Sequence, residues 1–335
     1  MRSDSLIIQT APLPGFREIQ ALYHFFTMSK AANDINDCFQ DHRALNDKQL
    51  RKRISSELPD PDEYAETLML RGERYASVAP AVLTLVTQIM AADPELVVHY
   101  NRYAYASALS SFNNRTSQHL LPESVRALYP DELKRMRRQY IEFKDTFFTL
   151  ENTNFVKDIA ITKYQLIPLG AEYAEPNGGV SLRLLLRLRQ GKRLWALASI
   201  LWRAGGNRPF YSLHLHALSI RDFDESGCRQ MYLRLGALLE ANPLVKGMTS
   251  ASWFLDPAMN SISPHLAHHR QLPETHGALI LFLRPEGANS GALEKSAKRR
   301  QLFSEGRYVP RVHMRIWVKQ DILAWCRAQD STVIN

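Results

Sequence analysis

Histidine, arginine and carboxylate side chains gather in the segment YSLHLHALSIRDFDESG, residues 211–227. Its first part alternates like a β-strand, which would turn His214 and His216 toward the same side. Two imidazoles on one side could bind a metal ion, and a single imidazole could act as a general base. His216 comes near the end of the predicted strand and is therefore the better placed of the two to act as a base.

A metal site at His214 and His216 would need further ligands. The nearby candidates are Asp222, Asp224 and His265. The competing interpretation places both histidines on a solvated strand face. The pattern HxxHH at 265–269 adds at most two ligands on one helical face. We therefore expect no metal, and a metal-dependent enzyme built on His214 and His216 stands as an alternative.

The cysteines Cys38, Cys228 and Cys326 lie far apart and form no CxxC pair. They are typical of buried small side chains in a reducing compartment. Cys228 begins a predicted helix, a position that lowers the pKa of a thiol. Because the sequence assigns it no histidine partner, we expect it to be buried.

Composition and apolar patterning indicate a soluble cytoplasmic protein. The chain has 335 residues, of which 45% are hydrophobic and 23% are charged. Apolar runs such as LTLVTQIMAA, residues 83–92, are too short to cross a bilayer, so no membrane span is expected. The start MRSDSLIIQTAPLPGF lacks the basic region and long apolar core of a secretion signal.

The net charge is +8, which favours an anionic partner such as nucleic acid, a phosphate-rich cofactor or an acidic carrier protein. The excess of positive charge is clearest in residues 292–319, which contain two glutamates and eight basic residues. These are Lys295, Lys298, Arg299, Arg300, Arg307, Arg311, Arg315 and Lys319.

The first half of the chain has helical periodicity. PELVVHYNRYAYASALSSF spaces its apolar residues at three and four, and Asp93 with Pro94 marks its start. PDELKRMRRQYIEFKDTFFTL has a similar opening. We expect a helical domain over residues 1–155 and an α+β domain over residues 156–335.

Strand patterns begin near residue 180. VSLRLLLRLR alternates, RLWALASILWR is apolar on both faces, and FYSLHLHAL follows after a turn. These three segments predict an antiparallel meander. A helix (CRQMYLRLGALLEA), a strand (GMTSASWFL), a helix-like segment (SPHLAHHRQL), a strand (ALILFL), a basic helix (ALEKSAKRRQLFSEG), a strand (RVHMRIWVK) and a short helix follow.

This order resembles the core of the GNAT acyltransferases. In that family an antiparallel meander is followed by a helix, a strand splayed from its neighbour, a helix and two closing strands. The resemblance covers residues 180–335 and rests on the order of elements. It implies transfer of an acyl group from coenzyme A, or from a thioester on an acidic carrier protein, to an amine. SASWFLDP and SEGRYVPRVHMRIW also resemble a group of bacterial proteins, which bears on origin and not on activity.

In the GNAT family the fourth strand leads into a phosphate-binding loop patterned Gln/Arg-x-x-Gly-x-Gly/Ala. The resemblance places Arg221 at its basic position, with Ser226 and Gly227 supplying amides to a pyrophosphate. The motif itself is absent. Three acids, Asp222, Asp224 and Glu225, stand where the pyrophosphate would bind. Acids in a first helical turn are also what capping favours, so a plain helix cap is the preferred interpretation of these three.

Amide-forming acyl transfer needs a base for the ammonium and a donor for the thioester carbonyl. His216 is the first candidate base and Asp256 the second. Tyr308 could protonate the leaving thiolate, and Trp253 would border the cleft. The other tryptophans are expected in the core. The sequence names neither the small-molecule acceptor nor the acyl chain. The alternative is a basic nucleic-acid-binding or regulatory protein without catalysis.

Overall fold

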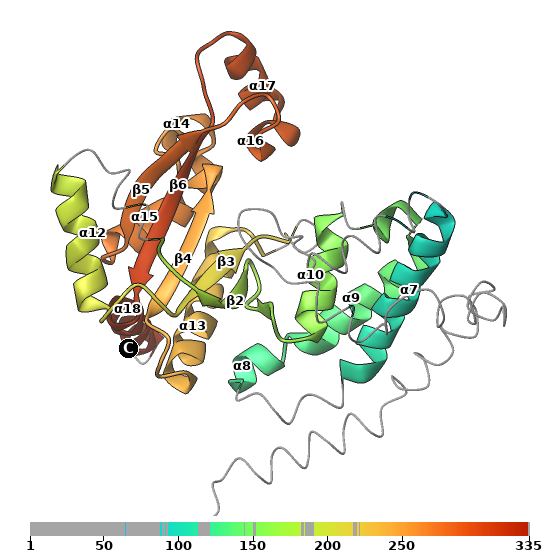
Figure 1. Cartoon of the computed structure of the whole chain (residues 1–335). Helices are drawn as coiled ribbons and strands as arrows, with labels where there is room; N and C mark the ends of the chain where they lie inside the picture. The colour runs from blue at the N-terminus through green and yellow to red at the C-terminus, as the bar shows by residue number, and fades with distance from the viewer. Residues whose placement is uncertain are drawn as a thin grey trace, which may run out of the picture.

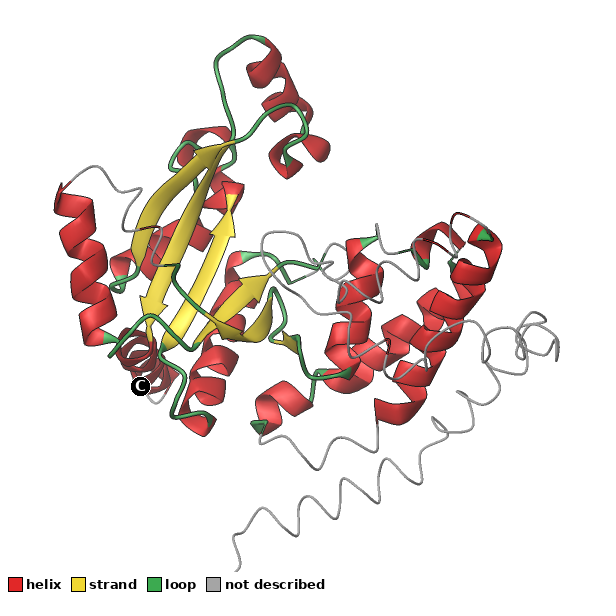
Figure 2. Cartoon of the chain, in the orientation of Figure 1, coloured by secondary structure: helices red, strands yellow, loops and turns green. Residues whose placement is uncertain are grey.

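The computed structural model describes residues 64, 88, 91, 93–112, 121–143, 145–149, 152–181, 184, 191–216, 220 and 222–333. Within these, helices pack around a six-stranded sheet of order β1-β2-β3-β4-β6-β5, so the predicted α+β class is confirmed. Figure 2 shows the helices on both sides of the sheet and beyond its β1 edge. The part of the predicted helical domain before Asp93 lies almost wholly outside the described residues.

Between residues 93 and 162, the described part of the chain contains four helical segments that precede the sheet. They are α7 (Pro94–Ser111), α8 (Glu123–Arg126), α9 (Tyr129–Glu142) and α10 (Thr153–Thr162), with the 3-10 turn η3 (Asp145–Phe147) before α10. The predicted cap of α7 is confirmed, since the Asp93 carboxylate accepts a hydrogen bond from the Leu96 amide at 3.1 Å. α9 lies where PDELKRMRRQYIE predicts a helix and ends at Glu142, because Phe143 is extended.

The sheet begins with three antiparallel strands, β1 (Ile167–Pro168), β2 (Tyr173–Gly178) and β3 (Phe210–His214). α13 (Glu225–Ala241) then leads to β4 (Gly247–Ser252), which lies parallel to β3. After β4 come η4 (Trp253–Leu255), α14 (Met259–Ile262), η5 (Pro264–Leu266) and α15 (His268–Thr275). β5 (Leu279–Pro285), α16 (Gly291–Glu294), α17 (Ala297–Ser304), β6 (Arg311–Val318) and α18 (Lys319–Val333) complete the chain, with β6 between β4 and β5.

The predicted strand RLWALASILWR is wrong, because these residues form helix α12 (Gly191–Arg203). Leu197, Ile200 and Leu201 follow helical spacing and pack against the sheet. The expectation of buried tryptophans also fails here, since Trp195 and Trp202 are 76% and 87% exposed. A short segment that is apolar on both faces is compatible with a buried strand or with a helix. Here the segment is helical, with one face packed on the sheet.

The predicted strand at 180–189 lies mostly outside the described residues, although Leu184 is helical. The predicted meander of three strands joined by turns is therefore wrong, because its middle segment is α12, which lies between β2 and β3 in the chain. The antiparallel strands on this side of the sheet are β1, β2 and β3. β2, with the sequence YAEPNG, has no alternating apolar pattern. Its strand conformation comes from pairing with β3, which sequence periodicity does not report.

Both faces of the sheet are covered. On one face α12 packs against Phe210, Ile316 and Val318. On the other face, α13 and α18 pack against the strand residues that are adjacent in sequence, including Tyr211 and Trp317. The alternation of strand side chains therefore divides β3 and β6 between two apolar layers. Figure 1 shows α12 beside β5, and α16 and α17 beyond the ends of β5 and β6.

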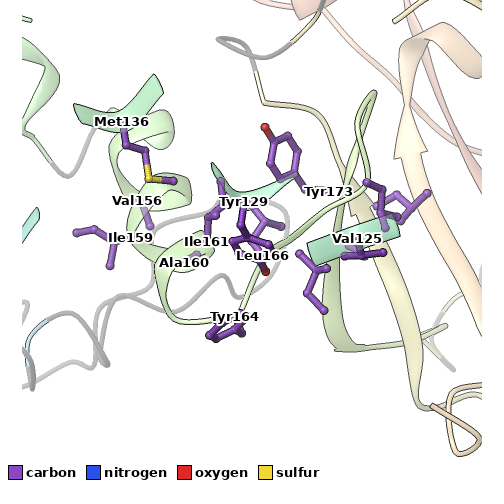
Figure 3. Close-up of a cluster of buried hydrophobic side chains, with 14 of the residues drawn as sticks. Val125, Tyr129, Met136, Val156, Ile159, Ala160, Ile161, Tyr164, Leu166 and Tyr173 are labelled. Carbon is purple, nitrogen blue, oxygen red and sulfur yellow. The ribbon is translucent and has the colours of Figure 1, made fainter. Parts of the chain in front are cut away.

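The larger apolar cluster continues from the sheet into the helices that precede it. Figure 3 shows Met136 of α9 and Val156, Ile159 and Ala160 of α10 in the same group as Tyr173 of β2. The predicted boundary between residues 155 and 156 lies within α10, and described residues on both sides share this cluster. The division into two domains stays a prediction. Within the described residues, no helix is both long and apolar enough to cross a membrane.

A buried carboxylate joins the helices to the sheet. Asp158 of α10 is 0% exposed and contacts α7, α9 and the segment that follows β3. It accepts hydrogen bonds from the Tyr105 hydroxyl at 2.8 Å and from Arg135 at 2.6 Å, and His216 Nε2 lies 3.0 Å away. Burial alone would raise the pKa of Asp158, but Arg135 and His216 lower it below its ordinary value. The carboxylate therefore stays ionised inside the protein.

We expect Asp158→Asn to lower the free energy of unfolding by roughly 3 kcal/mol at neutral pH, because a buried charge pair loses one partner. Urea denaturation measures this difference. Glu142→Gln on α9 is the control, since Glu142 is 58% exposed and 3.7 Å from Arg138 and should change stability by no more than about 1 kcal/mol. Equal stability of the two variants would contradict the role given to Asp158.

The neighbouring Lys157 gives a pH-dependent prediction. It is 6% exposed and donates to the Leu215 carbonyl at 2.7 Å. Burial, partly offset by Asp158, lowers its pKa from 10.5 to about 8. Below this value Lys157 is charged in both states and folding buries the charge. Between 8 and 10.5 the folded chain loses a proton that the unfolded chain keeps, so this residue makes stability rise with pH.

Lys157→Met should therefore remove a pH-dependent part of stability. Between about pH 7 and about pH 10 we expect the free energy of unfolding of the wild type to rise by up to about 3 kcal/mol relative to that of Lys157→Met. Chemical denaturation at both pH values measures it. Exposed Lys134→Met on α9 controls for the loss of a lysine. A difference that stays constant with pH would contradict the buried charge.

Candidate functional site

β3 and β4 are the parallel pair of the described sheet, and they separate early. Their register pairs are Tyr211 with Met248 and Ser212 with Thr249. β3 continues to His214 and β4 to Ser252, but neither strand pairs with the other beyond these two positions. Ligands of α/β sheets bind at the carboxyl ends of neighbouring parallel strands, so the separation marks a place for one.

A buried ion pair lies across this separation. Arg315 of β6 is 0% exposed, and its guanidinium lies 3.3 Å from both carboxylate oxygens of Glu172, which directly precedes β2. The same guanidinium donates to Ser250 of β4 at 3.0 Å, to the His269 carbonyl at 3.0 Å and to the Tyr232 hydroxyl. The pair therefore holds β6, β4, α13 and α15 in one arrangement with the start of β2.

A cavity of about 420 Å³ lies beyond the end of β4. η4 follows β4 directly and delivers Asp256 to its wall, and the segment between α17 and β6 delivers Tyr308. The structure thus brings together two of the predicted catalytic residues. The other lining residues are Ala258, Ser261, Ile262, Lys298, Leu302, Arg307, Val309 and Arg311.

Asp256 and Tyr308 both carry a buried polar atom without a hydrogen-bond partner among the residues that the structure describes. Asp256 is 1% exposed, and its Oδ1 accepts from the Ala258 amide at 3.0 Å while its Oδ2 has no partner. The Tyr308 hydroxyl likewise has none. Buried polar atoms are normally satisfied, so two unsatisfied atoms in one cavity wall point to a polar ligand.

The cavity has a positive rim and an acidic wall. Lys298, Arg307 and Arg311 line it and are exposed, and Arg307 makes a 2.9 Å contact with Glu305. Burial, followed by the charge of Asp256, raises the pKa of Tyr308 to about 12, so its hydroxyl keeps its proton at neutral pH. The Asp256 carboxylate could bind an ammonium group, and the Tyr308 hydroxyl could donate a proton. The basic side chains at the rim could bind an anionic group.

The remaining predicted residues lie elsewhere. His216 is fully buried against Asp158, and His214 lies 2.7 Å from a different carboxylate, Glu175. Trp253 lies in η4, after β4 has ended, where its ring stacks on Arg299 at 4.7 Å. Arg221 lies outside the described residues.

The start of α13 is a capped helix terminus. The Asp224 carboxylate accepts a hydrogen bond from the Gly227 amide at 2.7 Å, so that amide already has an acceptor. Ser226 is exposed in the same turn. A Cβ at Gly227 would meet the Asp222 carbonyl oxygen at 2.0 Å. Close backbone packing therefore accounts for this glycine.

Cys228 is buried, as predicted, but it has a partner that sequence reasoning missed. Its Sγ lies 3.4 Å from Nδ1 of His269. Burial raises the pKa of the Cys228 thiol far above its ordinary value, and the negative charge of Glu172 raises it further. A helix start usually has the opposite effect on the pKa of a thiol. The two residues are 41 positions apart, and the pattern HxxHH was the only sequence signal near them.

In comparisons with known proteins, no protein-family model, curated protein or solved structure matches this chain.

Gly227→Ala should lower the free energy of unfolding by about 1–3 kcal/mol, because the added methyl group overpacks the turn. Gly287→Ala is the matched control, since a Cβ there meets no atom within 4 Å. Urea denaturation of both variants measures the effect. If Gly227→Ala is as stable as the control, the close packing does not explain this glycine.

Proposed function

We propose that this protein transfers an acyl group from a pantetheine thioester to an amine. The observation that carries the proposal is the parallel pair β3–β4, joined through α13 and separating after two register pairs. A slot between two such strands is what the GNAT resemblance implies for the pantetheine arm. The position of β6 between β4 and β5 is consistent with the two closing strands of that family.

The cavity beyond β4 supplies side chains for the two ends of the reaction. The amine arrives as an ammonium and must lose a proton before its nitrogen attacks the thioester carbonyl. Asp256, with its unpartnered Oδ2, would hold the ammonium and accept this proton. As the C–N bond forms, the C–S bond breaks, and Tyr308 would protonate the departing thiolate. The pKa of Tyr308, about 12, suits a group that must keep its proton until that step.

Charge favours a thioester donor that carries phosphate. Lys298, Arg307 and Arg311 line the cavity, whereas three acids crowd the start of α13. A donor phosphate would therefore be held near α17 and the start of β6 and not at the α13 terminus. Coenzyme A and the phosphopantetheine arm of an acidic carrier protein both fit this charge distribution.

Acyl transfer is tested by release of free thiol from acyl-coenzyme A and from an acyl-carrier protein, each with a panel of amines. We expect Tyr308→Phe to lower kcat about 100-fold or more with the active donor, because the thiolate then leaves unprotonated. Asp256→Asn should raise KM for the amine and also lower kcat, because the amide cannot accept the ammonium proton, while its side-chain oxygen keeps the turn at Ala258.

The control is Tyr129→Phe in α9, which removes another buried hydroxyl that has no partner in the described part of the chain. It should leave thiol release unchanged. The proposal fails if no thioester raises the Tm of the wild-type protein and none is turned over. It also fails if Tyr308→Phe and Asp256→Asn react as fast as Tyr129→Phe.

A further inference from the structure

Three potential metal ligands meet between the start of α13 and the start of α15. Cys228, His268 and His269 each offer one ligand atom, and these atoms lie within 4.8 Å of one another. Cys228 and His269 are 1% and 0% exposed, and His268 is half-buried, which leaves an approach from solvent. The group is distinct from the cavity that contains Asp256 and Tyr308.

The His268 imidazole is oriented as metal-binding histidines usually are, and both ring nitrogens of His269 lie within 4 Å of the Cys228 sulfur, Nδ1 at 3.4 Å and Nε2 at 3.9 Å. The His268 ring hydrogen bonds with the backbone of His265, while its Nε2 is buried and has no partner within the described chain. The His269 ring hydrogen bonds with the backbone of Phe223. In metal sites one ring nitrogen typically donates to a carbonyl, which fixes the tautomer, and the other faces the ion. The backbone bond of His268 leaves its Nε2 for this purpose.

One sulfur and two imidazole nitrogens form a donor set that suits zinc. Arg315 contributes a nearby positive charge, but it is paired with Glu172. Asp224 and Glu225 are close enough to act on the charge of His268 and would offset the charge of a divalent ion. A tetrahedral ion with three protein ligands keeps one position for water.

We propose that Cys228, His268 and His269 bind a zinc ion, which ties the first turn of α13 to α15. Binding replaces the thiol proton of Cys228 by the metal, so one proton is released to solvent and no redox step is involved. The competing explanation of the 3.4 Å contact is a simple hydrogen bond between the thiol and His269.

The test uses the full-length protein purified without chelators. Elemental analysis should find about one zinc ion per chain. Replacing zinc by Co²⁺ should give a thiolate-to-cobalt charge-transfer band together with the intense visible bands of a tetrahedral site. Cys228→Ser should abolish the charge-transfer band, and His268→Asn should lower zinc affinity at least about 100-fold, since loss even of an outer-shell partner costs about 10- to 100-fold.

Cys326→Ser is the matched control, because Cys326 is a partly buried cysteine outside this ligand group, and its thiol donates to the Tyr232 carbonyl at 3.6 Å. It should keep both the metal and the spectrum. Zinc should raise the Tm of the wild type and of this control but not that of Cys228→Ser. If Cys228→Ser does not fold, His268→Asn decides alone.

Two results would overturn the zinc site. One is a Co²⁺ spectrum without a thiolate band in the folded wild-type protein. The other is zinc affinity unchanged in His268→Asn. Either would leave the thiol–imidazole hydrogen bond as the explanation. Thiol release from acyl thioesters is measured separately, so failure of the zinc site does not affect the proposed acyl transfer.

Discussion

The buried ion pair between Arg315 and Glu172 is the interaction on which the arrangement of the sheet depends. Its guanidinium contacts β4, α13 and α15 and reaches the residue that precedes β2. A charge in a region that excludes water is tolerated only when its partner and hydrogen bonds are in place. The pair therefore fixes the relative positions of these elements where β3 and β4 separate, and the same arginine borders the Cys228–His269 contact.

A second buried charge performs the same task between the helices that precede the sheet and the segment after β3. Asp158 brings Tyr105, Arg135 and His216 together, so the helices before the sheet and the segment after β3 share one polar centre. Apolar packing between these parts would allow several similar arrangements, whereas directional bonds to one carboxylate allow few. His216 is thus part of what holds β3 against α10.

Acidic and basic side chains gather at two different places in the structure. Acids surround the start of α13, where Asp224 caps the helix, and cations surround the cavity between α14, α17 and β6. An anionic ligand is drawn to the second place and repelled from the first. The proposed donor site and the proposed zinc site therefore occupy regions of opposite charge.

The sequence by itself determined the elements whose signals are local. Asp93 and Pro94 start α7, and helical or alternating spacing located α13 and β6 correctly. The tertiary structure decided what depends on distant partners: α12 is a helix because one face packs on the sheet, and β2 is a strand because β3 pairs with it. Asp256 and Tyr308 were named from sequence, but their shared cavity, and the contact of Cys228 with His269, came only from folding. Periodicity and capping act within a few residues, whereas burial and ion pairing join residues far apart in the chain.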